Sequence, residues 1–281
     1  MDKFFQPVEN YKVPETRNMN FIHKILKWYF SPIILGMENL DKNKPALYVS
    51  NHTLLGITDG PLYIPELFNE KDIYLRVLVD KMHEGMPVLR SMLSDYGAVV
   101  GSRENCEALM KQKQHILVFP GGTNEICKNK GEEYQLLWKQ RYGFAKLAIE
   151  NNYPIIPISS LGGDELYDII LDKEDILDSK IGRWMQDNGI VDKYFRGGDI
   201  IPPIVKGVGL TLIPKPKKIY YLFGEPISTT AYLKESAPLN LKDLRKKTEK
   251  AIIDGITKLR IERANQPEEA ESTWKNFLNS L

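Results

Sequence analysis

Short apolar runs alternate along this 281-residue chain with longer segments whose apolar residues recur every three or four positions. Apolar runs of strand length between helical patterns are typical of a sheet whose crossover helices pack on its faces. We interpret as strands the runs at 46–50, 73–79, 96–100, 116–119, 155–159 and 218–223. The pattern therefore predicts an α/β fold with a mixed, largely parallel central sheet flanked by helices.

The segments between these runs predict the helices and the division of the chain. We expect helices at 104–114, 132–151 and 164–181, and one or two polar helices from 239 onward. Prolines and glycines crowd 197–216, which favours irregular or edge structure because proline cannot donate to a sheet ladder. We predict an N-terminal segment 1–38, a main domain 39–230, and a helical extension 231–281 packed on that domain.

The most apolar stretch of the chain is 21–37, which Lys24 and Lys27 interrupt and Pro32 divides. A membrane-spanning helix needs roughly 20 predominantly apolar residues, so this stretch is too short and too charged to span. Aromatic residues around Trp28 stand beside the lysines, and these residue types settle at the headgroup boundary. The sequence predicts an N-terminal amphipathic helix that either docks at a membrane interface or packs on the core.

The composition narrows the classes of partner, cellular setting and cofactor that we expect. Lys and Arg total 38 against 37 Asp and Glu, so net charge gives no reason to expect a nucleic-acid partner. Two cysteines, Cys106 and Cys127, are too few for a disulfide framework, and the first twenty residues lack the pattern of a secretory signal. We expect a reduced, cytoplasmic setting. Histidines at metal-ligand spacing and glycine-rich nucleotide loops are also missing from the sequence, so we expect no metal.

One histidine follows the first strand of the predicted domain directly. Asn51 and His52 come just after 46–50, and Asp59 lies seven residues beyond His52. Loops at the carboxyl ends of strands are where sites form in open α/β sheets. An imidazole suits proton abstraction near neutral pH, and a carboxylate can orient it. His52 is therefore a candidate general base with Asp59 as its partner; the alternative is a histidine buried at a strand end.

A second group follows the strand predicted at 116–119. Pro120, Gly121 and Gly122 offer backbone amides without side chains in the way, which suits an oxyanion. Thr123 and Glu125 add polar groups, which we expect to face solvent or substrate. A plain turn would also account for Pro-Gly-Gly by itself.

Taken together, these motifs resemble the phospholipid/glycerol acyltransferase superfamily, in the branch nearer to diacylglycerol and phytyl-ester acyltransferases. Five blocks resemble the family's in the family's order and cover about 39–227: His52 with Asp59, then 96–103, 119–125, 152–158 and 223–227. The resemblance implies a glycerol-phosphate-acyltransferase-like version of the predicted fold.

Two departures from the superfamily's usual pattern affect what the resemblance implies. The usual motif leaves four residues between His and Asp, whereas six separate His52 from Asp59, and Ile57 stands at the usual Asp position. The third block commonly reads Phe-Pro-Glu-Gly-Thr-Arg, with the Glu and Arg linked to a glycerol phosphate, but this chain has Gly121 and Asn124 there. The resemblance therefore favours a neutral lipid acceptor over a phosphorylated one.

The resemblance implies an O-acyltransferase that moves a fatty acyl group directly from a thioester to a lipid hydroxyl. Acyl-CoA or an acyl carrier protein thioester is the expected co-substrate, with no further cofactor. His52 and Asp59 are the implied catalytic residues. The implied substrate contacts are Asn51, Arg103, Gly121, Gly122, Thr123 and Glu125, and the implied donor contacts are Lys128 and Lys130.

Three alternatives remain open from the sequence. We expect the chain to act as a peripheral protein at the cytoplasmic face of a membrane. The first alternative is a lysophospholipid or glycerol-phosphate acyltransferase, which would act at the same place. A lipid-binding protein without catalysis would bind lipid and release no product. A lipid esterase would use His52 to activate water instead of an alcohol.

Overall fold

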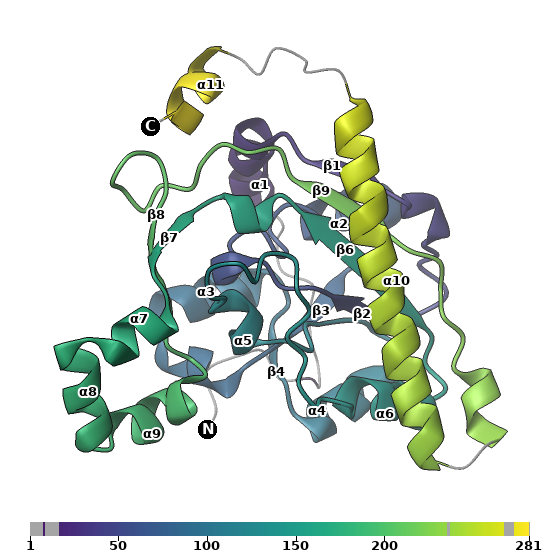
Figure 1. Cartoon of the computed structure of the whole chain (residues 1–281). Helices are drawn as coiled ribbons and strands as arrows, with labels where there is room; N and C mark the ends of the chain where they lie inside the picture. Colours follow the sequence, from purple (N-terminus) through teal and green to yellow (C-terminus); the bar gives the residue numbers. More distant parts are fainter. Residues whose placement is uncertain (1–7, 9–16, 235–236, 267–272, 281) are drawn as a thin grey trace.

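Seven strands form one sheet in the computed structural model, with the order β1-β9-β6-β2-β5-β3-β4 (Figure 1). The structure describes residues 8, 17–234, 237–266 and 273–280. The strands are β1 (Ile33–Leu35), β2 (Leu47–Ser50), β3 (Leu75–Val79), β4 (Val99–Val100), β5 (His115–Val118), β6 (Ile155–Leu161) and β9 (Tyr220–Phe223). Strands β7 (Asp168–Leu171) and β8 (Ile204–Lys206) pair separately as a two-stranded ribbon.

Strand directions make the sheet mixed but largely parallel. Strand β6 pairs antiparallel with β9, and every other neighbouring pair in the sheet runs parallel. The predicted fold class is therefore confirmed. Parallel strands need long crossover connections, and the segments between these strands supply them with helices.

Alternate residues of the central strands enter two separate cores, one on each face of the sheet. In β2, Tyr48 belongs to one cluster, while Leu47 and Val49 belong to the other. Ile116 and Leu117 of β5 divide in the same way. Successive side chains of a strand point to opposite faces, and both faces here are covered. This explains why the strands read as unbroken apolar runs in the sequence.

Helices cover the two faces and fill the crossovers (Figure 1). The longest, α10 (Ala237–Asn265), lies against β6 and β9. The other α-helices are α1 (Arg17–Phe30), α2 (Ile64–Lys71), α3 (Pro87–Asp95), α4 (Arg103–Lys111), α5 (Thr123–Ile126), α6 (Gly143–Glu150), α7 (Lys173–Asp178), α8 (Lys180–Asp187), α9 (Ile190–Phe195) and α11 (Thr273–Ser280). Single 3-10 turns lie at Met37–Asn39, Leu54–Gly56, Lys81–Gly85, Gly163–Glu165, Arg196–Gly198 and Thr230–Lys234.

The helix predicted over 132–151 is wrong for its first half. Only α6 is helical there, and the backbone before it turns through left-handed conformations at Tyr134 and Lys139. The amides of Tyr134 and Leu137 donate to buried carboxylates of other segments instead of to carbonyls of their own helix. Tertiary hydrogen bonds have therefore overridden the local helix preference.

The helix predicted over 164–181 is also wrong in its first part. Leu166 and Tyr167 enter the core, and β7 then pairs antiparallel with β8. Helix α7 begins only after Asp172, whose carboxylate accepts the amides of Glu174 and Asp175 as a capping box. Apart from β8 and a short 3-10 turn, 197–216 is irregular, as the prolines and glycines predicted.

The predicted N-terminal amphipathic helix is present as α1, and the two predicted C-terminal helices are α10 and α11. Helix α1 turns Met19 and Phe30 into the core and leaves Phe21 and Trp28 exposed. Within the described part of the chain, no helix combines the length and the apolar character that a membrane crossing requires. Most of the first sixteen residues lie outside the described residues, and the predicted division at 38 and 231 stays a prediction.

Helix α10 can approach β6 closely because it carries a glycine at the crossing. A Cβ atom at Gly255 would lie 2.1 Å from the hydroxyl oxygen of Ser159 on β6. The same hydroxyl donates to the carbonyl of Ile252, one turn earlier on α10. The contact between α10 and the sheet therefore depends on having no side chain at Gly255.

We expect Gly255→Ala to destabilise the protein by about 1–3 kcal/mol, because the added methyl group overpacks this contact. Gly143→Ala is the matched control, since a Cβ atom there, at the start of α6, would meet nothing within 4 Å. Urea denaturation of the two variants checks this. Equal stability of Gly255→Ala and Gly143→Ala would contradict the assigned close contact.

Candidate active site

Three loops meet at the carboxyl edge of the sheet. Strand β2 lies between β6 and β5 and runs parallel to both, so all three strands end at the same edge. The loops that leave them are 51–60, 119–128 and 162–165. Crevices at the carboxyl ends of parallel strands are where α/β proteins bind ligands.

His52 and Asp59 lie in contact within the first of these loops. The Nδ1 atom of His52 is 2.5 Å from the Oδ2 atom of Asp59. When Nδ1 carries the ring proton, its N–H group donates to the carboxylate, and the lone pair of Nε2 can then accept a proton. The structure thus brings together the two residues that the sequence paired, despite the longer interval between them.

A tight turn closes that longer interval. Leu55 and Gly56 both have positive φ, at 59° and 67°. The Asp59 carboxylate accepts the amide of Thr53 at 2.7 Å and its hydroxyl at 2.8 Å. A Cβ atom at Gly56 would lie 3.3 Å from Cε1 of His52, so glycine gives the ring its room. Ile57, at the usual aspartate position, is instead 37% exposed.

The imidazole is partly accessible, whereas its partner is not. The side chain of His52 is 19% exposed, and that of Asp59 is 2% exposed. Phe119 stacks on the imidazole with ring centroids 4.0 Å apart, which fixes the ring plane. Burial and the nearby Asp59 charge raise the pKa of Tyr63 and Tyr221 well above the ordinary tyrosine value. Their hydroxyls are therefore neutral beside the carboxylate.

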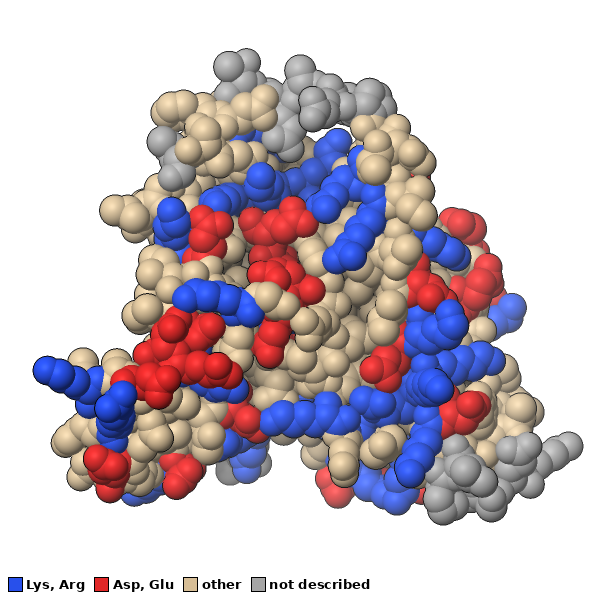
Figure 2. Space-filling view, viewed as in Figure 1, with Lys and Arg blue, Asp and Glu red and all other residues tan. Residues whose placement is uncertain are grey.

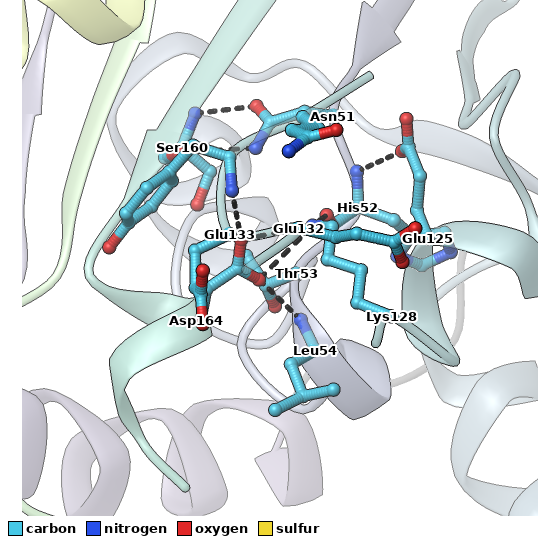
Figure 3. A network of polar contacts seen from close by, with 12 residues as sticks. Asn51, His52, Thr53, Leu54, Glu125, Lys128, Glu132, Glu133, Ser160 and Asp164 are labelled. Atoms are coloured by element: carbon cyan, nitrogen blue, oxygen red, sulfur yellow. Dashed lines mark hydrogen bonds and ion pairs between the residues drawn. The ribbon is translucent and has the colours of Figure 1, made fainter. Parts of the chain in front are cut away.

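Three successive backbone amides of this loop donate to three different buried carboxylates, of which Figure 3 shows those of Glu125 and Asp164. The amide of His52 donates to Glu125 at 2.7 Å, that of Thr53 to Asp59 at 2.7 Å, and that of Leu54 to Asp164 at 2.6 Å. Backbone donors in an irregular segment need such partners when they are buried. These bonds define the path of the loop that carries the imidazole.

Glu125 is a structural part of the site. It is fully buried, and its other carboxylate oxygen accepts the amide of Leu137 at 2.9 Å. Burial raises the pKa of this carboxyl, and the Lys128 charge opposes that effect. Thr123 is 7% exposed and Glu125 is not exposed at all, so neither side chain faces bulk solvent, and their predicted substrate contacts stay predictions.

Lys128 and Asp164 form a buried ion pair next to the His52 backbone (Figure 3). The Lys128 Nζ atom donates to Asp164 at 3.0 Å and to the carbonyl of His52 at 2.7 Å. Asp164 also accepts the amides of Leu54 and Tyr134. The side chains of Lys128 and Asp164 are 2% and 1% exposed. The predicted donor contact of Lys128 stays a prediction, and the structure shows its ammonium group bonded within the protein.

Asn51 joins the histidine loop to β6. Its amide nitrogen donates to the carbonyl of Ser160 at 3.1 Å, and its amide oxygen accepts the Ser160 amide at 2.8 Å (Figure 3). Asn51 is fully buried. Its predicted substrate contact stays a prediction, while the structure shows it linking two strand ends.

The Pro-Gly-Gly turn is held by an arginine that follows it in sequence. Nη1 of Arg141 donates to the carbonyls of Pro120 at 2.8 Å and Gly121 at 2.7 Å. Gly122 has a φ of 50°, and its amide donates to the carbonyl of Phe119 at 3.0 Å. The Gly122 amide is thus engaged within the turn, and the predicted oxyanion role of these glycines stays a prediction.

Two predicted basic contacts lie in exposed ion pairs. Arg103 pairs with Glu107 at 2.7 Å and with Glu150 at 2.9 Å, at the start of α4. Lys130 pairs with Asp175 of α7 at 2.6 Å. Exposed pairs of this kind exchange easily for other partners. Their predicted contacts with substrate and donor remain predictions.

A cavity of about 250 Å³ adjoins the histidine loop. It shares Leu54, Lys128 and Asp164 with the hydrogen-bond network just described, and Tyr167 closes another side. The remaining lining residues are Asn129, Lys130, Glu133, Asp168 and Ile169. His52 is not among the lining residues, so the cavity lies beside the imidazole loop and does not enclose the ring.

We expect Lys128→Met to destabilise the protein by about 3–5 kcal/mol, because it leaves Asp164 charged and buried without its cation. Lys130→Met is the matched control, two residues away, and should cost at most about 1 kcal/mol because its ion pair is exposed. Denaturant unfolding of both variants measures the difference. Similar losses in the two proteins would contradict the assigned burial of the pair.

Comparisons with known proteins agree with the resemblance seen in the sequence. A family described as diacylglycerol acyltransferase matches residues 11–244. Phytyl ester synthase 2 of Arabidopsis thaliana is 31% identical over 261 residues, which cover 81% of this chain and 34% of that protein. A human protein named as a DGAT1/2-independent enzyme synthesizing storage lipids is 30% identical over 147 residues, 49% of this chain and 45% of that protein.

The chain therefore spans about a third of the length of its phytyl ester synthase relative. Among solved structures, the 1-acyl-sn-glycerophosphate acyltransferase PlsC of Thermotoga maritima is similar at a TM-score of 0.49 and 19% identity, covering 86% of this chain and 79% of that one. The family match covers well over half of the residues and includes all three loops of the site. This chain belongs to the diacylglycerol acyltransferase family.

Proposed function

We propose that this chain is a lipid O-acyltransferase that transfers a fatty acyl group from a thioester to the hydroxyl of a neutral lipid. The observation that carries the proposal is the His52–Asp59 pair, with a partly exposed imidazole at the carboxyl edge of the sheet. The family match supports the same chemistry, as do relatives named for phytyl ester and storage lipid synthesis.

The proposed reaction needs one proton acceptor and no covalent enzyme intermediate. Nε2 of His52 takes the proton of the acceptor hydroxyl while that oxygen attacks the thioester carbonyl. Asp59 stabilises the imidazolium that forms, because its carboxylate already accepts the Nδ1 proton. The tetrahedral intermediate then collapses, the carbon–sulfur bond breaks, and the imidazolium returns its proton to the departing thiolate.

A cysteine nucleophile is a poorer account of the chemistry. Burial raises the pKa of the Cys127 thiol to about 11 and that of Cys106 to about 12. A thiol in this state is almost entirely protonated near neutral pH, and only the thiolate is a good nucleophile. Direct transfer through His52 is therefore the simpler mechanism.

We propose acyl-CoA or an acyl carrier protein thioester as donor, without a further cofactor, and a neutral alcohol as acceptor. The third block lacks the Glu and Arg linked to a glycerol phosphate, having Gly121 and Asn124 in their places. The carboxylate of Glu125 does not replace the missing Glu, because both its oxygens already accept backbone amides. This favours a neutral acceptor over lysophospholipid or glycerol phosphate.

We expect His52→Ala to lower ester formation by about 100- to 10,000-fold, because it removes the general base. Mass spectrometry of products from a panel of acyl thioesters with neutral and phosphorylated alcohols measures this. His83→Ala is the matched control, since His83 lies outside the three loops. A folded His52→Ala protein with near-normal turnover would reject the mechanism. If free fatty acid is the sole product of the wild type, the protein is an esterase. If no substrate pair of the panel gives a product, a lipid-binding protein is favoured.

We expect Asp59→Asn to lower turnover less than His52→Ala does, because the base remains but loses the carboxylate that orients and stabilises it. The carboxamide can still accept the Thr53 amide, so the turn should persist. Comparing kcat and KM with the same thioester checks this, and the loss should fall mainly in kcat. Unchanged kcat in a folded variant would show that the pair has no catalytic role.

A further inference from the structure

Three segments far apart in the sequence expose large apolar side chains. Helix α1 exposes Phe21 (66%) and Trp28 (64%), and the loop after β8 exposes Leu210 (91%). Helix α11 exposes Phe277 (62%). Contiguous exposed apolar side chains in a folded protein mark an interaction surface. We call docking surface the set Phe21, Ile25, Trp28, Leu210, Leu212, Ile213 and Phe277, all of which are at least half exposed.

Ring stacking and hydrogen bonds join the three segments into one surface. Trp28 of α1 stacks on Trp274 of α11 with ring centroids 4.8 Å apart. The neighbouring Tyr29 donates its hydroxyl to the carbonyl of Pro214 at 2.6 Å, which fixes the loop after β8 against α1. Lys275 of α11 donates to the hydroxyl of Ser31 at 2.7 Å. The apolar side chains are therefore held on neighbouring elements.

The charges of these segments are all of one sign. None of the 37 acidic residues of the chain falls within 17–30, 204–218 or 273–280. The basic residues of the same segments are Arg17, Lys24, Lys27, Lys206, Lys215, Lys217, Lys218 and Lys275. Lys27 pairs with Glu66, and both Lys206 and Lys215 pair with Asp168, so three of these lysines have acidic partners on adjacent segments. Figure 2 shows a band of Lys and Arg side chains crossing the face just below α11.

We propose that the docking surface binds the interface of a bilayer that contains anionic lipid. Aromatic and aliphatic side chains enter the headgroup region, while lysines beside them pair with lipid phosphates. Even with Glu66 and Asp168 counted, basic residues outnumber acidic ones on the described residues of these segments, and this positive excess complements such a membrane and repels a second copy. The proposal deepens the proposed function. It rests on that function only for the reason why the chain would bind a membrane, which is access to a lipid acceptor.

The docking surface is connected to the cavity beside the histidine loop. Leu212 accepts a hydrogen bond through its carbonyl from the Tyr167 hydroxyl at 3.2 Å. Tyr167 lines the cavity together with Leu54, two residues after His52. The loop after β8 therefore extends from the docking surface to the wall of this cavity.

Vesicle flotation of the full chain tests the apolar part of the proposal. The variant Phe21→Ser/Leu210→Ser/Phe277→Ser should bind vesicles of phosphatidylcholine with phosphatidylglycerol at least about tenfold more weakly than wild type. Ile181→Ser/Trp184→Ser on α8 is the matched control, because these side chains are 72% and 58% exposed outside the surface. Wild-type binding by the first variant, or equal loss in the control, would overturn the proposal.

A charge variant tests the lipid chemistry. Lys24→Glu/Lys217→Glu should weaken binding to vesicles with phosphatidylglycerol, and added salt should weaken wild-type binding in the same way. Lys111→Glu/Lys113→Glu, near the end of α4, is the control and should bind as wild type does. Sedimentation of the wild type as a dimer that the apolar variant dissociates would assign the surface to a second copy and overturn the proposal.

The outcome is separable from that of the proposed reaction. His52→Ala should bind vesicles as wild type does, because its loop is not part of the docking surface. The apolar variant should keep its turnover with a short-chain thioester and a water-soluble alcohol. Normal vesicle binding by a wild type without transferase activity would reject the reaction alone, whereas normal activity without vesicle binding would reject the docking surface alone.

Discussion

Hydrogen bonding between buried carboxylates and consecutive backbone amides sets the shape of the site. The loop after β2 is irregular, so it cannot satisfy its own donors in a ladder or a helix. Glu125, Asp59 and Asp164 accept the amides of His52, Thr53 and Leu54 in turn, and each carboxylate comes from a different strand-end loop or turn. Because a buried donor without a partner costs about 1–3 kcal/mol, the three loops are energetically tied to one another.

Buried carboxylates also need compensation, and the site supplies it unevenly. Asp164 has the Lys128 ammonium, and Asp59 has the His52 imidazole and the Thr53 hydroxyl. Glu125 accepts backbone amides, no cation of the described residues forms an ion pair with it, and burial raises the pKa of its carboxyl. The carboxylate paired with the imidazole thus belongs to a network that holds it in place. Such support is what keeps a catalytic pair within productive geometry.

The proposed reaction and the proposed docking surface use different parts of one scaffold. The parallel strands deliver the His52 loop to the carboxyl edge, while the irregular segment after β8 runs from the cavity wall to α1. Helix α10 is packed tightly on the sheet through Gly255, so the sheet gives both regions a rigid base. The two regions are thus separate, and the Tyr167–Leu212 hydrogen bond connects the cavity wall to the docking surface.

The sequence by itself determined the α/β class, six of the seven strands of the main sheet and the family, because apolar runs buried on both faces and five ordered blocks are local signals. It also selected His52 and Asp59. The longer interval between them argued against Asp59, but the positive φ angles of Leu55 and Gly56 turn the chain so that the two side chains meet. It missed Asp164 and the strands β1 and β7, and it misplaced the helices at 132–151 and 164–181. Only the tertiary structure decided these, because a buried carboxylate binds amides from segments distant in sequence, and no local pattern records which amides those are.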